Sequence, residues 1–212
     1  ELDGLRVLVS RTGYTSELGF EIYLYEASKN GVALWEKVLE AGQPHGLEVI
    51  GPCHIRRIEG GILALGPGCD MWYDTNPYEV GMGYDWMVDL EQGSDFIGKE
   101  ALARIKQEGA KRKLVGVEIG GEPLGAYNDG AMVDFFGVDR DGERIGRVTS
   151  ACFSPRLERN IGYAMVPTEH SELGTELEVE TPRERTSAVI VEKPFIDPKK
   201  ETPKQELAGT AG

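Results

Sequence analysis

Hydrophobic and polar positions alternate near the start of the chain, within Leu5–Ser10 and again within Phe20–Leu24. A period of two residues is typical of β-strands, and the glycine-bounded segment Gly13–Gly19 provides the turn between them. The pattern therefore predicts an antiparallel pair of strands. Because neighbouring side chains point to opposite faces of a strand, Glu21 shares a face with Tyr23.

Three later stretches have helical spacing of their hydrophobic residues. The first is expected over residues 28–42, with Ser28 as its N-cap and Gly42 at its end. A second is expected over residues 55–63 and a third over residues 101–107. The order β-β-α-α-α at the start of the chain indicates an α+β fold.

From Lys113 onward, short hydrophobic runs separated by turn residues replace the helices. Six strands are expected, at 114–119, 131–136, 144–149, 161–166, 176–180 and 188–191. Short strands at regular spacing are typical of an antiparallel barrel or sandwich. Residues 199–212 are polar and lack periodicity, which predicts a disordered tail.

Composition narrows the functional classes. The net charge of −13 over 212 residues repels phosphate backbones, so we expect no nucleic-acid partner. No hydrophobic run reaches the length of a membrane helix, so no membrane partner is expected either. Three cysteines without CxxC spacing argue against a disulfide framework and against a zinc site. A reducing compartment fits this pattern best, and we predict a cytoplasmic protein with no metal.

Candidate chemistry is sparse when each motif is taken alone. Glu21 offers a planar double acceptor beside aromatic rings, although most strand carboxylates are simply solvated. Arg57 could reach an internal carboxylate, and Asp70 and Asn76 are expected to have capping or turn roles. Gly93–Glu100 nearly matches a phosphate-binding loop, but its last residue lacks the metal-binding hydroxyl, so a plain loop entering a helix is favoured.

Six segments, taken in order, point to a family. Arg11–Ile22 resembles RTGYTGExGxEI, Arg57–Gly61 resembles RLEAG, Asn76–Gly81 resembles [TN]PxExG, Asp95–Leu102 resembles DFIGKEAL, Gly146–Pro155 resembles GxVTSGxxSP, and Pro194–Pro198 resembles PFYDP. Together they resemble the glycine cleavage T-protein (aminomethyltransferase) family, over about residues 5–198.

This resemblance implies a tetrahydrofolate-dependent one-carbon transferase built from three domains in a cloverleaf. It implies that 1–46 belongs to the first, folate-facing α+β domain, that 47–112 belongs to the second α+β domain, and that 113–198 is a C-terminal antiparallel Greek-key β-barrel. It also implies that Glu21 holds the pterin ring of folate and that Tyr14 lines the same site. A carboxylate suits this role because it can accept two parallel N–H bonds from an aminopyrimidine edge.

Departures from the family pattern refine the hypothesis. Cys53 stands where the family has a folate-contacting arginine. The sequence of residues 55–61 and 70–79 is more similar to the demethylase branch, which includes dimethylsulfoniopropionate demethylase. Leu34–Glu36 resembles the folate domain of dimethylglycine and sarcosine dehydrogenases. In the demethylase case, Trp72 and Tyr73 could accept a cationic sulfonium by cation–π contact.

The start of the chain bears on the same hypothesis. It opens at Glu1 without a methionine, and we expect it to be a processed product or a piece of something longer. The family's catalytic aspartate lies in an N-terminal half that these residues do not contain, so no catalytic residue is predicted here. The missing half is then an expected partner, together with folate and a small one-carbon donor. The alternatives are a non-catalytic folate-binding or regulatory module, and the folate domain of a dehydrogenase-type protein.

Overall fold

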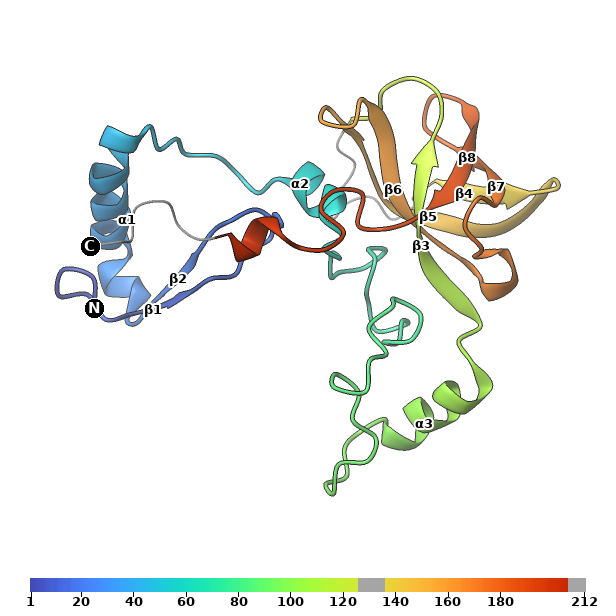
Figure 1. Cartoon of the computed structure of the whole chain (residues 1–212), viewed down its shortest axis with the longest axis horizontal. Helices are drawn as coiled ribbons and strands as arrows, with labels where there is room; N and C mark the ends of the chain where they lie inside the picture. Colours follow the sequence, from blue (N-terminus) through green and yellow to red (C-terminus); the bar gives the residue numbers. More distant parts are fainter. Residues whose placement is uncertain (126–135, 206–212) are drawn as a thin grey trace. The chain divides into compact units, whose positions relative to one another are not determined.

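The computed structural model describes residues 1–125 and 136–205 (Figure 1). The chain divides into two compact units. The N-terminal unit consists of Glu1–Cys53 together with Lys199–Gly212, of which the structure describes Lys199–Gln205. The barrel unit consists of His54–Pro198.

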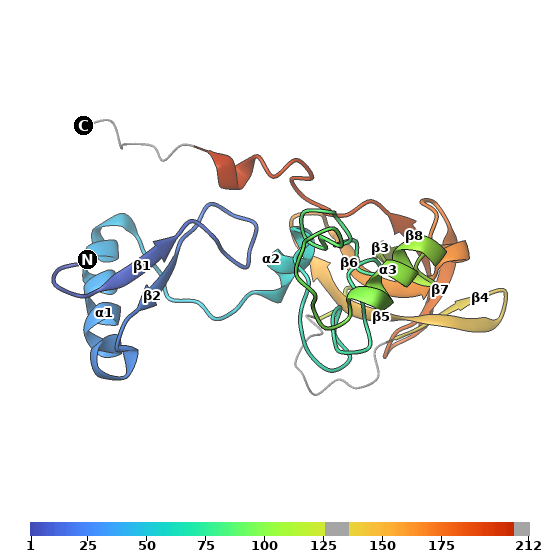
Figure 2. The same ribbon diagram turned by 90° about the horizontal axis from the view of Figure 1, so that it is seen from below.

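A two-stranded antiparallel sheet and one helix make up the N-terminal unit (Figure 2). The strands are β1, Val7–Ser10, and β2, Glu21–Leu24. Their register places Ser10 directly opposite Glu21. The helix α1, Ala27–Gly42, leads into a short 3-10 helix, Gln43–His45. The predicted strand pair and helix are thus confirmed.

The start of α1 differs from the prediction. The N-cap is Glu26 rather than Ser28, and its side chain makes no capping hydrogen bond. Glu26 adopts a left-handed backbone conformation with a φ of 52°. The chain therefore turns sharply between β2 and α1, and the helix begins before Ser28 can act as the cap.

The first part of the tail is also a correction. Thr202–Lys204 form a 3-10 helix, where a disordered tail was predicted. Arg11 donates a hydrogen bond to the backbone carbonyl of Gln205, and Lys200 donates one to Ser16 Oγ at 2.9 Å. These bonds give polar tail residues partners that composition alone does not reveal. Residues 206–212 lie outside the described part of the chain.

The barrel unit contains a closed antiparallel barrel of six strands. The strands are β3 (Arg112–Ile119), β4 (Gly137–Arg140), β5 (Glu143–Ser154), β6 (Arg159–Pro167), β7 (Glu176–Glu180) and β8 (Arg185–Val191), with a 3-10 helix, Thr168–His170, after β6. Their order around the barrel is β3-β6-β5-β4-β7-β8. The run β7-β4-β5-β6 is a Greek key, so the predicted Greek-key barrel is confirmed. The predicted strand 131–136 falls almost entirely outside the described residues.

Hydrophobic side chains fill the barrel interior. Val117, Val138 and Val148 have no exposed surface, and Ile190 is 1% exposed. These β-branched residues suit a pleated, buried surface. The closed ring also leaves no unpaired strand edge. The barrel is therefore well packed within the chain itself.

One outer wall of the barrel is covered by residues 54–82, the covering segment, which begins with α2, His54–Glu59. Ile58 and Val80 pack there against barrel residues, among them Tyr163. The helix was predicted to run to Leu63 but ends at Glu59. Gly61 has a φ of 78°, and Ile62 N–H donates to the Arg57 carbonyl at 2.8 Å. This is a Schellman motif, which ends helices at glycine.

The third predicted helix is present as α3, Lys99–Glu108. Gly98 precedes it with a φ of 92°, so Gly93–Glu100 is a loop entering a helix, as favoured from the sequence. The predicted domain boundaries at 46/47 and 112/113 stay predictions. Among residues 1–125 and 136–205, no helix is long and apolar enough to cross a membrane.

Candidate functional site

Glu21 lies at the start of β2, half-buried, with two hydroxyl partners. Thr12 Oγ1 and Tyr23 OH both donate hydrogen bonds to Oε2 of Glu21, the second at 3.2 Å. Within the described part of the chain, no hydrogen bond reaches Oε1. Glu21 is therefore fixed in orientation by one oxygen and presents the other as an available acceptor.

A ligand can displace the two hydroxyls that donate hydrogen bonds to Glu21. Thr12 Oγ1 lies 3.1 Å from Ser10 Oγ, which is an alternative acceptor for its single proton. Tyr23 is 53% exposed, and its bond to Glu21 is long for an O–H donor. That bond raises the pKa of the Tyr23 phenol, because the phenolate would face a carboxylate. Both oxygens of Glu21 could thus receive donors from a ligand.

Tyr14, the other predicted folate residue, is placed in the loop between β1 and β2. It is 42% exposed, and it is not one of the hydrogen-bond partners of Glu21. Sequence reasoning placed Tyr23 on the face of Glu21 but did not assign Thr12 to the site. The strand register supplies the missing signal, since Ser10 opposite Glu21 brings the following residues close to it.

The predicted donor-binding aromatics, Trp72 and Tyr73, lie in the loop after Asp70. Their ring centroids are 5.7 Å apart, with an interplanar angle of 61°. Trp72 is half-buried, whereas Tyr73 is 89% exposed. An edge-to-face pair with one exposed ring can present an aromatic face to a cation.

Arg57 and Asp70 form a buried ion pair between the α2 segment and the barrel. The Nη1–Oδ2 distance is 2.8 Å, and neither side chain is exposed. Asp70 Oδ2 also accepts from the backbone N–H of Ala64, and Oδ1 accepts from Thr149 at 2.6 Å and Ser150 at 2.7 Å. The predicted structural ion pair is confirmed. Every acceptor position of Asp70 is used internally, so this carboxylate cannot also bind a ligand.

Asn76 and Glu79 form a reciprocal capping box. The Glu79 N–H donates to Asn76 Oδ1 at 3.3 Å, and the Asn76 N–H donates to Glu79 Oε2 at 3.1 Å. Arg112 then pairs with Glu79, with an Nε–Oε1 distance of 2.9 Å, and this contact raises the pKa of the guanidinium. The predicted turn role of Asn76 is confirmed.

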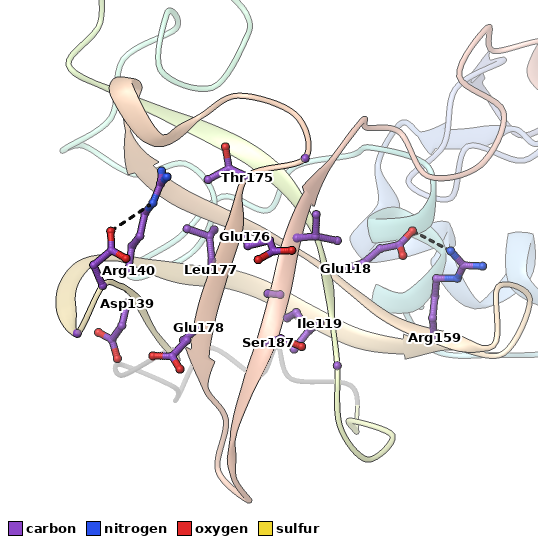
Figure 3. Close-up of a pocket in the computed structure, with 16 residues that line it drawn as sticks. Glu118, Ile119, Asp139, Arg140, Arg159, Thr175, Glu176, Leu177, Glu178 and Ser187 are labelled. Atoms are coloured by element: carbon purple, nitrogen blue, oxygen red, sulfur yellow. Dashed lines mark hydrogen bonds and ion pairs between the residues drawn. The ribbon is translucent and has the colours of Figure 1, made fainter.

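A groove lies on the surface of the barrel unit, lined by residues of β3, β4, β7 and β8 among others (Figure 3). Carboxylates outnumber arginines in its lining: Glu118, Asp139, Asp141, Glu176 and Glu178 against Arg140 and Arg159. Both arginines are paired, Arg159 with Glu118 at 2.9 Å and Arg140 with Asp141 at 3.8 Å. None of the predicted site residues lies there. An acidic lining disfavours a ligand that carries carboxylates, as folate does.

Within residues 1–125 and 136–205, no group of three or more potential ligands is arranged to hold a metal ion. Cys53, Cys69 and Cys152 form no disulfide bond. Burial raises the pKa of the Cys69 thiol, which disfavours its thiolate form.

The fold is a small α/β unit with a carboxylate-bearing strand, followed by a Greek-key barrel. Two family models match it: the GCVT N-terminal domain over residues 1–92, and the glycine cleavage T-protein C-terminal barrel domain over residues 112–197. The class defined by this fold and sequence is that of the T-protein domains. The chain belongs to the glycine cleavage T-protein family.

Individual relatives agree with this assignment. The chain is 39% identical to an aminomethyltransferase of Caldanaerobacter subterraneus, over 92% of this chain and 49% of the relative. It is 42% identical to an aminomethyltransferase of Symbiobacterium thermophilum, over 89% of this chain and 48% of the relative. The chain thus spans about half the length of the curated relatives it matches.

A solved structure supports the same relationship. The crystal structure of the glycine cleavage system aminomethyltransferase T from Bartonella henselae superposes with a TM-score of 0.72 at 28% sequence identity. The match covers 89% of this chain and 49% of that one.

Proposed function

We propose that the chain is the C-terminal portion of a tetrahydrofolate-dependent one-carbon transferase. Family membership supports this, because the relatives above are named aminomethyltransferases. The observation that carries the proposal for this chain is the state of Glu21. Its carboxylate is oriented by Thr12 and Tyr23 while Oε1 remains an open acceptor.

The residues around Glu21 fit the pterin ring of tetrahydrofolate. The aminopyrimidine edge of a pterin presents parallel N–H donors, which match the two oxygens of a carboxylate. Tyr14 and Tyr23 are close in sequence to Glu21 and partly exposed, and each can supply stacking area. Tetrahydrofolate, when bound, supplies a nucleophilic nitrogen that accepts the one-carbon unit. The role of this chain is then to hold and orient the ring.

The group transferred is proposed to be a methyl group, carried on a sulfonium sulfur or a methoxy oxygen of the donor, or an aminomethyl group. Trp72 and Tyr73 would contact a cationic donor centre, with a contribution of roughly 0.5–2 kcal/mol. Correct positioning of donor and acceptor can supply about 7–11 kcal/mol of a reaction barrier in favourable cases. We propose that the catalytic group lies in a part of the longer protein that this chain does not include. We also propose that the protein is cytoplasmic.

Glu21→Gln tests the site directly in the complete gene product. The amide keeps the shape but places an N–H where the pterin also presents one. Losing a charge-assisted hydrogen bond should weaken tetrahydrofolate binding by about 1.5–3 kcal/mol in a calorimetric or fluorescence titration. Glu36→Gln, an exposed change on α1, is the matched control and should bind as the wild type does. Unchanged affinity in Glu21→Gln would mean that Glu21 is only a solvated strand residue.

Transfer assays separate the enzyme from the alternatives. The complete gene product is given tetrahydrofolate and, in turn, sulfonium, methoxy, aminomethyl and N-methyl amino acid donors. A methylated or methylene folate product identifies the donor class. Folate binding without transfer from any donor would favour the non-catalytic folate-binding module. Transfer that requires an attached oxidase would favour the dehydrogenase-type protein.

A further inference from the structure

Lys193 follows β8 and lies, half-buried, between the barrel wall and the segment that covers it. Its Nζ is 5.9 Å from the centroid of the Tyr163 ring, which is fully buried and stacks on Phe195. On the other side, a Cβ placed on Gly81 would lie 3.9 Å from the same Nζ. The ammonium therefore lies between an aromatic ring and the backbone of the covering segment, and the side chain stays partly exposed.

The nearby carboxylate cannot serve as its partner. Asp70 is close enough to interact electrostatically with Lys193. However, its two oxygens already accept four hydrogen bonds, from Arg57, Ala64, Thr149 and Ser150. A carboxylate oxygen has two lone pairs, so these four bonds use the acceptor capacity of Asp70. The charge of Asp70 is also already matched by that of Arg57.

Lys193 is thus left as an extra positive charge in this layer. Within residues 1–125 and 136–205, its ammonium makes no hydrogen bond and no ion pair. Burial lowers the pKa of Lys193, and the field of Asp70 only partly opposes this effect. A half-buried cation without a partner is unfavourable unless a ligand or water compensates it.

We propose that Lys193 is an anion-binding residue that takes the carboxylate of a small ligand. One unpaired ammonium is neutralised by one negative charge. A phosphate dianion would bring a second negative charge towards Asp70, so a monoanionic carboxylate fits better. On the proposed function, the ligand is a one-carbon donor of the methylated amino acid or sulfonium acid type, which carries one carboxylate.

The site can be tested on the 212-residue chain by NMR of lysines that carry ¹³C-dimethyl groups. Lys193→Met assigns the Lys193 resonance by removing it. We expect this resonance to titrate below the ordinary pKa of a lysine side chain. Lys29, whose side chain is 71% exposed, is the control for non-specific effects. Propionate at constant ionic strength should shift the Lys193 resonance saturably and raise its titration midpoint, while Lys29 stays unchanged.

Further ligands identify the source of the carboxylate. Dimethylglycine should shift the Lys193 resonance at lower concentration than p-aminobenzoylglutamate, the carboxylate tail of folate. The reverse order would overturn the assignment to the donor. Tighter binding of inorganic phosphate than of propionate would overturn the assignment of a monoanionic ligand. Equal shifts of the Lys193 and Lys29 resonances would show that no site exists. Hydrogen exchange of the barrel amides gives a second measurement. Propionate should slow this exchange in Lys193→Arg, which keeps the charge, and should not slow it in Lys193→Met.

Failure here and failure of the proposed function are distinguishable. Tetrahydrofolate binding that depends on Glu21, without any carboxylate effect at Lys193, would overturn only the Lys193 proposal. A carboxylate effect at Lys193 without folate binding would overturn the proposed function and the donor assignment, and leave the anion site standing.

Discussion

The two units of the chain differ sharply in how their apolar side chains are used. No described residue of the N-terminal unit is buried, whereas the barrel unit holds the whole buried core. Val32 on α1 is 71% exposed, and Tyr23 on β2 is 53% exposed. The residues proposed to contact folate therefore lie on the unit with the least packing of its own. The barrel, by contrast, can be stable without further chain.

This difference has a physical consequence for function. An isolated two-stranded sheet is marginally stable in water and needs further strands or a helix against a hydrophobic face. The orientation of Glu21 therefore rests on its hydrogen bonds from Thr12 and Tyr23 rather than on packing within this unit. The barrel, with its closed ring of strands, then serves as the rigid part of the chain.

The largest effect is expected from the buried ion pair. Asp70→Asn leaves the Arg57 charge uncompensated at a site with no exposure, and removing one partner of such a pair destabilises a protein by about 3–5 kcal/mol. Urea unfolding followed by tryptophan fluorescence measures this loss. Asp141→Asn changes a carboxylate that is 94% exposed on the same unit and should leave the midpoint unchanged. A small effect of Asp70→Asn would mean that the covering segment is not held by this pair.

A matched pair of isoleucines tests the contrast between the units. Ile190 in the barrel is 1% exposed, whereas Ile22 on β2 is 38% exposed. Ile190→Ala should reduce the free energy of unfolding by about 2–5 kcal/mol because it leaves a cavity. Ile22→Ala should change it by only about 0.5 kcal/mol, as expected at a surface position. Equal losses measured on the 212-residue chain would contradict the proposed division.

The barrel was the part of the fold that its own sequence specified best. Glu176–Glu180 was placed with correct ends, and the other described strands differ at their ends, because short alternating runs and turn residues mark strands locally. The ends of α1 and α2 were less predictable. They depend on the left-handed backbone of Glu26 and on the Schellman motif at Gly61, which hydrophobic spacing does not encode.

The candidate site was predictable only in part. The Arg57 ion pair followed from residue type and position, whereas the role proposed for Glu21 rests on the family resemblance and stays a prediction. The identity of the Arg57 partner did not follow from the sequence, because Asp70, Thr149 and Ser150 meet only when β5 packs on the α2 segment. Lys193 was not singled out for the same reason, since its isolation depends on Asp70 being saturated by other donors.

The central claim is that folate is held by β2 of the N-terminal unit, and hydrogen exchange on the complete gene product tests it most directly. Adding tetrahydrofolate should slow exchange at the amides of Glu21–Leu24 and leave the barrel strands unchanged. Slowed exchange in the barrel groove around Glu176–Glu180, with none at β2, would contradict the claim.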